Sequence, residues 1–65
     1  MKDFNKHEAL IKYLKDNNGV TILRIINFLD YMDKALYSEV EVLEMIEDIK
    51  KEYTVVHKGD LWLIE

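Results

Sequence analysis

The chain has 65 residues, no cysteine and no proline, and its 13 acids outnumber its 9 lysines and arginines to give a net charge of −4. At this length we expect a single domain, residues 1–65, that buries only about 60% of the surface its unfolded chain exposes. The lack of cysteine excludes disulfides and thiolate metal sites, and the hydrophobic content of 49% excludes a disordered chain.

The sequence also predicts a soluble protein. Its longest apolar run comprises the four residues from Leu61 to Ile64, whereas a membrane helix needs about 20. The residues from Met1 to Lys6 have neither an apolar core nor a cleavage-type ending, which argues against a secretory signal. We therefore expect a cytoplasmic location and no contact with a membrane.

A first helix is predicted to begin after Asn5, whose side chain can cap it, with Glu8 three residues later. Residues 17–19, Asn-Asn-Gly, predict its end, because asparagine and glycine accept the left-handed conformation at a helix C-terminus. Val20 and Thr21 are expected to form one or two strand-like pairings, and Thr21 to cap the next helix. The apolar stripe of this first helix comprises Leu10, Tyr13 and Leu14.

A second helix, predicted at about Ile22 to Asp33, is apolar around most of its circumference. Such a helix is either central to the fold or covered in part by another molecule. We keep both alternatives: the rest of the chain covers it, or it forms a homodimer interface. One stripe comprises Ile22, Ile25, Ile26, Leu29 and Met32, while Leu23, Phe28 and Tyr31 extend the apolar surface beyond it.

A third helix is predicted from Glu39 to Lys51 or Glu52. Ser38 and Glu41 have the S-x-x-E spacing of a capping box, in which each side chain accepts a hydrogen bond from the backbone N–H of the other residue. Val42, Met45, Ile46, Ile49 and Tyr53 cluster on one side of this helix, and the opposite side carries Glu41, Glu44, Glu47, Asp48 and Lys51.

The last part of the chain predicts a β-hairpin. Two short apolar runs, Tyr53 to Val56 and Leu61 to Ile64, are joined by His57 to Asp60. A tight hairpin needs a residue that tolerates positive φ, and Gly59 supplies it. The second run is apolar on both faces, so part of its surface is free for a partner unless the helices cover it. Together these elements predict an α+β fold of three helices followed by a C-terminal β-hairpin.

This order of elements resembles the winged helix-turn-helix superfamily over nearly the whole chain. The segment from Leu10 to Thr21 is similar to the usual first helix and its exit into a short strand, and Ile46 to Val56 is similar to the end of a recognition helix entering the wing. The resemblance implies that Glu39 to Lys51 is the recognition helix and His57 to Asp60 the wing tip. It also implies DNA binding, the best-known activity of the fold.

The charge of the third helix contradicts that implication. Residues 38–52 contain six acids against Lys50 and Lys51, a net charge of −4, while the rest of the chain sums to zero. DNA affinity comes mainly from lysine and arginine neutralising phosphates. The leading hypothesis is therefore a non-enzymatic regulator or inhibitor, of phage or mobile-element type, that binds a protein with a basic surface. Its predicted protein-binding residues are Glu41, Glu44, Glu47, Asp48 and Trp62.

Other interpretations of these residues stay open. The acidic side can be simply solvated, with Glu47 and Lys51 as an ordinary i,i+4 pair, and a lone tryptophan in so small a domain more often belongs to the core than to an interface. The chain can also be a structural subunit that only dimerises through the second helix. The alternative function is a DNA-binding transcriptional regulator that uses Arg24, Lys50, Lys51 and Lys58.

No catalytic, metal-binding or cofactor-binding residues are predicted. Ser38 is better explained as a helix cap than as a nucleophile, and two isolated glycines cannot form a phosphate-binding loop. His7 and His57 lie far apart in sequence, with no acid or second histidine at the spacing of a metal site. We therefore expect that the chain is not an enzyme, and that His57 flanks an exposed turn.

Overall fold

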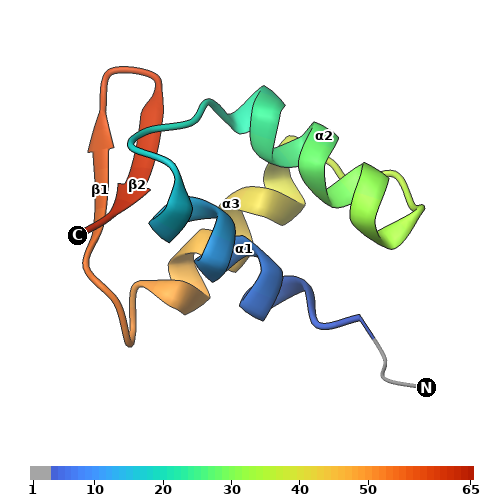
Figure 1. The fold of residues 1–65 in the computed structure, drawn as a ribbon, viewed down its shortest axis with the longest axis horizontal. Coiled ribbons are helices and arrows are strands. Elements are labelled where there is room, and N and C mark those ends of the chain that lie inside the picture. The colour runs from blue at the N-terminus through green and yellow to red at the C-terminus, as the bar shows by residue number, and fades with distance from the viewer. Residues whose placement is uncertain (1–3) are drawn as a thin grey trace.

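The computed structural model describes residues 4–65. Three helices, α1 (Lys6–Asp16), α2 (Ile22–Asp33) and α3 (Glu39–Ile49), precede an antiparallel hairpin of β1 (Val55–Lys58) and β2 (Leu61–Ile64) (Figure 1). This order confirms the predicted α+β fold of three helices and a C-terminal hairpin, and its topology is compatible with a winged helix. In the described part of the chain the longest helix has 12 residues, and none could cross a membrane.

Each helix begins at its predicted cap. The side-chain oxygen of the cap accepts a hydrogen bond from the backbone N–H three residues later, which satisfies one of the free donors at a helix start. The three bonds join Asn5 to Glu8 at 3.1 Å, Thr21 to Arg24 at 3.2 Å and Ser38 to Glu41 at 3.1 Å.

The reciprocal half of the predicted capping box does not form. The carboxylate of Glu41 lies 3.4 Å from the Nζ atom of Lys6 on α1, and the described residues contain no bond from it to the N–H of Ser38. The Glu41 carboxylate thus pairs with a lysine of the neighbouring helix instead of accepting a hydrogen bond from the N–H of Ser38, as the capping-box spacing predicts.

The boundaries of α3 and the hairpin differ from the prediction. Helix α3 ends at Ile49 rather than at Lys51 or Glu52, because residues 50–53 continue as a turn in which the N–H groups of Glu52 and Tyr53 both bond to the Ile49 carbonyl, at 3.0 and 2.9 Å. Strand β1 therefore starts at Val55, two residues later than predicted. His57 and Lys58 belong to this strand, so the loop is only Gly59 and Asp60, with Gly59 at φ +60° as expected.

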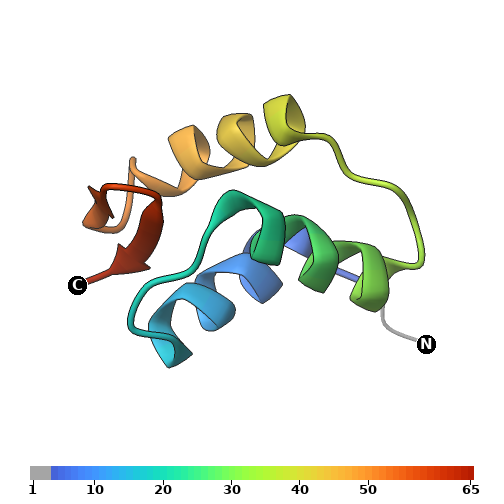
Figure 2. The same ribbon diagram turned by 90° about the horizontal axis from the view of Figure 1, so that it is seen from above.

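The hairpin is attached to the helices through Val20. Its N–H and carbonyl exchange hydrogen bonds of 3.0 and 2.7 Å with the backbone of Trp62, which confirms the predicted strand-like pairing of Val20. Figure 2 shows α3 along one side of the molecule, α1 and α2 along the other, and the hairpin closing one end.

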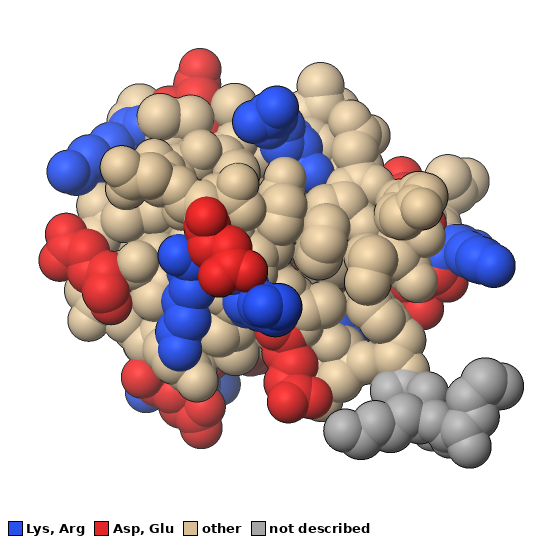
Figure 3. Space-filling model, in the orientation of Figure 1, with Lys and Arg blue, Asp and Glu red and all other residues tan. Residues whose placement is uncertain are grey.

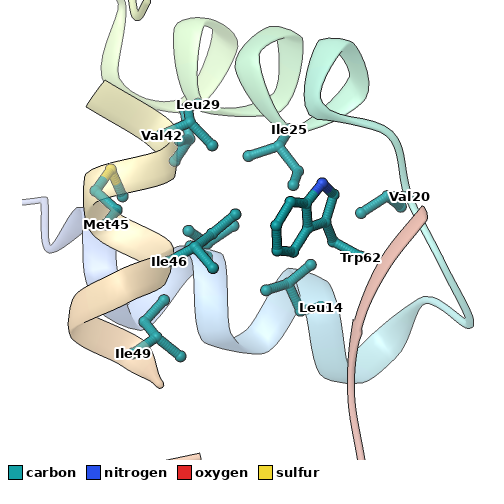
Figure 4. Close-up of a cluster of buried hydrophobic side chains, with 10 residues drawn as sticks. Leu14, Val20, Ile25, Leu29, Val42, Met45, Ile46, Ile49 and Trp62 are labelled. Carbon is teal, nitrogen blue, oxygen red and sulfur yellow. The ribbon is translucent and has the colours of Figure 1, made fainter. Parts of the chain in front are cut away.

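The core lies between these parts, and Trp62 reaches into it from β2 (Figure 4). The predicted faces of α1 and α3 are buried, apart from Tyr13 and Tyr53, which are half-buried against the core. Ten buried apolar residues form one cluster: Leu10, Leu14, Val20, Ile25, Leu29, Val42, Met45, Ile46, Ile49 and Trp62.

Candidate protein-binding surface

The outward side of α3 is the most distinctive surface that the sequence predicted. Glu44, Glu47 and Asp48 are exposed there, Glu41 is half-buried, and Val40 stands among them with 67% of its surface exposed. We call Glu41, Glu44, Glu47 and Asp48 the acidic face of α3. This surface combines negative charge with an exposed apolar side chain at its N-terminal end.

Three of the four carboxylates of the acidic face have cations beside them. Glu41 contacts Lys6 at 3.4 Å, Glu47 contacts Lys50 at 2.9 Å, and Asp48 lies 3.7 Å from Lys51 and 3.4 Å from the Nε2 atom of His7. The predicted pair of Glu47 with Lys51 is therefore wrong, because Lys50 lies nearer to Glu47 and Lys51 turns to Asp48. Glu44 makes no ion pair with a described residue.

These ion pairs leave the acidic face negative. The four carboxylates of the acidic face and the three lysines beside them sum to −4 + 3 = −1, and Glu39 and Glu52 bring residues 38–52 together with Lys6 to −3. Both partners of each lysine pair are substantially exposed, so each pair is worth only about 0–1 kcal/mol. A lysine or arginine from another protein can therefore replace these internal partners at little cost.

The four basic residues of the DNA-binding alternative lie on different elements. Arg24 is exposed on α2, Lys58 is exposed on β1, and Lys50 and Lys51 follow α3. Lys50 and Lys51 are the two lysines that contact Glu47 and Asp48. The face shown in Figure 3 likewise has basic and acidic side chains interspersed, with no area of a single sign. This arrangement reduces the positive charge available to a phosphate backbone.

Trp62, the fifth residue predicted to bind protein, is only 7% exposed and belongs to the core. Its ring stacks on the ring of His57, with centroids 3.7 Å apart and planes 8° from parallel. His57 is exposed, as expected, but it lies in β1 opposite Trp62 rather than in the turn. A partner could therefore reach Trp62 only at the edge of its ring.

The apolar surface of α2 is covered only in part. Ile25 and Leu29 are buried, and Phe28 stacks on Tyr13 of α1 with centroids 4.1 Å apart, whereas Leu23 and Tyr31 are 66% and 81% exposed. The rest of the chain thus covers one side of the helix and leaves the other in solvent. A homodimer through α2 stays a prediction.

A second feature, which sequence reasoning missed, is a hollow of about 460 Å³ between the N-terminal ends of α2 and α3 and the hairpin. We call it the α2–α3–wing hollow. Its lining comes from three segments far apart in the sequence, so no pattern within a single segment predicts it. Its lining includes the side chains of Leu23, Glu39, Leu43, His57, Asp60 and Trp62.

No protein-family model, curated protein or solved structure matches this chain. Within residues 4–65, no three histidine, aspartate or glutamate side chains come together as a metal ion would require.

Proposed function

We propose that this chain is a small non-enzymatic binding protein of winged-helix-like form, which captures a protein with a basic surface through α3. The observation that carries the proposal is the acidic face of α3, in the position that a DNA reader uses for its recognition helix. A net charge of −3 in this region repels phosphates and attracts lysine and arginine.

Charge and apolar surface have different parts in this interaction. The carboxylates attract the partner over a distance, which raises the association rate and sets the orientation more than it raises affinity. The affinity then comes from burying exposed apolar side chains such as Val40 on α3 and Leu23 on α2. A nucleic-acid-binding protein has a surface of the required charge, so regulation or inhibition of such a protein, of phage or mobile-element origin, is the role we propose.

The test is capture of the partner by charge-reversed variants. The tagged chain is incubated with nuclease-treated host extract, and the recovered protein is identified and quantified. Replacing Glu44, Glu47 and Asp48 together by lysine is expected to abolish its recovery. The control replaces Glu8, Asp16 and Glu65 by lysine, which changes net charge by the same amount away from the acidic face. Equal recovery with the two variants would remove the acidic face from the mechanism.

The second candidate function is DNA-dependent transcriptional regulation, favoured by the topology and by Lys58 on the exposed hairpin. It predicts binding to duplex DNA that weakens steeply as salt rises. Fluorescence anisotropy with a labelled duplex at 50 mM salt tests it, with Lys58→Gln as the diagnostic variant. We expect no binding, and a salt-dependent signal reduced by Lys58→Gln would reverse our ranking.

A further inference from the structure

The α2–α3–wing hollow, of about 460 Å³, is open to solvent and combines apolar walls with charged groups. Leu23 and Leu43 give it apolar walls, and Glu39 and Asp60 place two exposed carboxylates at its rim. Neither carboxylate makes an ion pair with a described residue, unlike most carboxylates of the acidic face.

A donor without a protein partner among the described residues borders the hollow. The side chain of Trp62 is more than nine-tenths buried, and its indole N–H makes no hydrogen bond with the described residues. The nitrogen is not among the fully enclosed polar atoms, so it reaches solvent, and Trp62 borders solvent at the hollow. In Figure 4 the nitrogen edge of the ring faces the N-terminal half of α2.

Two more donors face the same region. Helix α2 begins at Ile22, and the N–H groups of Ile22 and Leu23 precede the first N–H bonded within the helix. Thr21 caps only the N–H of Arg24. The positive end of the α2 dipole therefore lies beside the indole N–H. An occupant has to offer acceptors to these donors and a cation to the two carboxylates.

We infer that the α2–α3–wing hollow binds an arginine residue of the partner protein, held by its main-chain carbonyl as well as its side chain. The carbonyl accepts from the Trp62 indole and the start of α2. The alkyl stem packs between Leu23 and Leu43, and the guanidinium binds Glu39 and Asp60. Five donors in a planar fork let arginine engage two carboxylates at once, which the point charge of lysine does less well.

This inference rests on the proposed function and makes it more specific, because it names one residue of the basic partner. A free anion fits the hollow less well, since Glu39 and Asp60 would repel it. A neutral peptide satisfies the donors but leaves the carboxylates without a cation. Arginine within a peptide chain is the occupant that meets both requirements.

The test is a titration of the ¹⁵N-labelled full-length chain with a blocked peptide, acetyl-Ala-Gly-Arg-Gly-Ala-amide. The chain has one tryptophan, so the single indole N–H signal reports directly on the hollow. We expect a saturable shift of this signal. The same peptide with citrulline, the neutral isostere of arginine, should bind at least tenfold more weakly.

Matched variants locate the site. Glu39→Gln and Asp60→Asn are each expected to weaken binding of the arginine peptide at least fivefold, while Glu8→Gln, at an exposed carboxylate of α1 outside the hollow, leaves its affinity within twofold. Circular dichroism of each variant verifies that the fold is retained. Equal binding of the citrulline peptide, or an unchanged affinity in both Glu39→Gln and Asp60→Asn, would overturn the inference.

Two further arms separate this inference from its alternatives. A saturable indole shift with inorganic phosphate at lower concentration than with the arginine peptide would assign the hollow to anions and overturn it. No indole shift at 10 mM peptide would also overturn it, and capture from extract that still depends on Glu44, Glu47 and Asp48 would then leave the proposed function standing. Conversely, the arginine peptide can bind as expected while capture from extract is unchanged by reversing Glu44, Glu47 and Asp48. That result would remove only the proposed role of the acidic face and leave the inference about the hollow standing.

Discussion

Tyr37 is the residue that ties the connector between α2 and α3 to the end of α2. Its backbone N–H donates to Asp30 at 2.7 Å, and its hydroxyl donates to Asp33 at 2.6 Å. Burial of the phenol, its hydrogen bond to Asp33 and the negative charges of Asp33, Glu41 and Asp30 all raise the pKa of Tyr37 well above its usual value of 10.0. Lys34, at φ +53°, supplies the left-handed turn that lets the chain reverse without glycine.

This environment predicts a late-titrating tyrosine. In an absorbance titration at 295 nm, we expect one of the four tyrosines to ionise after the others, and Tyr37→Phe to remove that phase. The unfolded chain loses this proton near pH 10 while the folded chain keeps it, so the stability from Tyr37 is constant below about pH 10 and lost as pH rises further. The exposed Tyr31→Phe is the control, and loss of the late phase in that variant would contradict the assignment.

The two glycines of the chain predict substitution costs of different size. Gly19 has φ +117°, and a Cβ built there would lie 3.2 and 3.3 Å from the Cδ1 and Cβ atoms of Leu61, whereas Gly59 has φ +60° and open space. Gly59→Ala is expected to cost about 1–2 kcal/mol for the left-handed conformation alone. Gly19→Ala should cost more, because strain of about 1–3 kcal/mol adds to the contact with β2.

Urea unfolding measures both costs, with Gly59→Asn as the control because asparagine accepts the left-handed conformation. We expect the stabilities to rank Gly59→Asn above Gly59→Ala above Gly19→Ala. A Gly19→Ala protein as stable as Gly59→Ala would show that the Leu61 side chain makes room for the added methyl group at little cost.

At the scale of elements, the caps decide where the helices begin. The two residues of the capping box of α3, Ser38 and Glu41, are expected to differ in how much they stabilise the fold. Ser38→Ala removes the bond to the N–H of Glu41 and is expected to cost about 1 kcal/mol of unfolding free energy. Glu41→Ala should cost less, because it removes only the partly exposed ion pair with Lys6 and no second capping bond. Urea midpoints of the two variants make the comparison, and a larger loss in Glu41→Ala would show that the full capping box forms in solution.

The helices were predictable because their signals are local. Asn5, Thr21 and Ser38 each lie within three residues of the N–H groups they cap, and the bounds of α2 were predicted correctly. The start of β1 was missed because the turn at residues 50–53 extends the helical spacing to Tyr53 without extending the helix. Periodicity alone does not distinguish a turn that follows a helix from one more turn of it.

The candidate sites were less predictable because they combine distant residues. The charge of α3 was visible in the sequence, but Lys6 and His7 reach it only through the packing of α1 on α3. The stack of His57 on Trp62 depends on a register set by a two-residue loop, where four residues were expected. The α2–α3–wing hollow needs three segments to meet, which no single-segment pattern describes.

At the scale of the whole molecule, Trp62 packs the hairpin against all three helices, and Val55 and Ile64 of the hairpin also lie against the core. The side chain of Trp62 lies in the cluster that contains Leu14 of α1, Ile25 of α2 and Ile46 of α3, while its backbone is bonded to Val20 (Figure 4). A two-stranded hairpin alone is at best marginally stable in water. The hairpin therefore depends on its packing against the helices for its structure. The α2–α3–wing hollow, which the hairpin closes on one side, depends on the same packing.

This arrangement predicts that the chain unfolds as one cooperative unit. Trp62 fluorescence reports on the hairpin, and circular dichroism at 222 nm reports on the helices, so the two urea transitions are expected to coincide. Calorimetry should give an unfolding enthalpy of about 45 kcal/mol near 60 °C, from about 0.7 kcal/mol for each of 65 residues. Ile46→Val, which costs about 0.5–1.5 kcal/mol in the shared core, should shift both transitions together. A fluorescence transition that precedes the loss of helix would show that the hairpin detaches alone, and that the hollow exists in only part of the folded population.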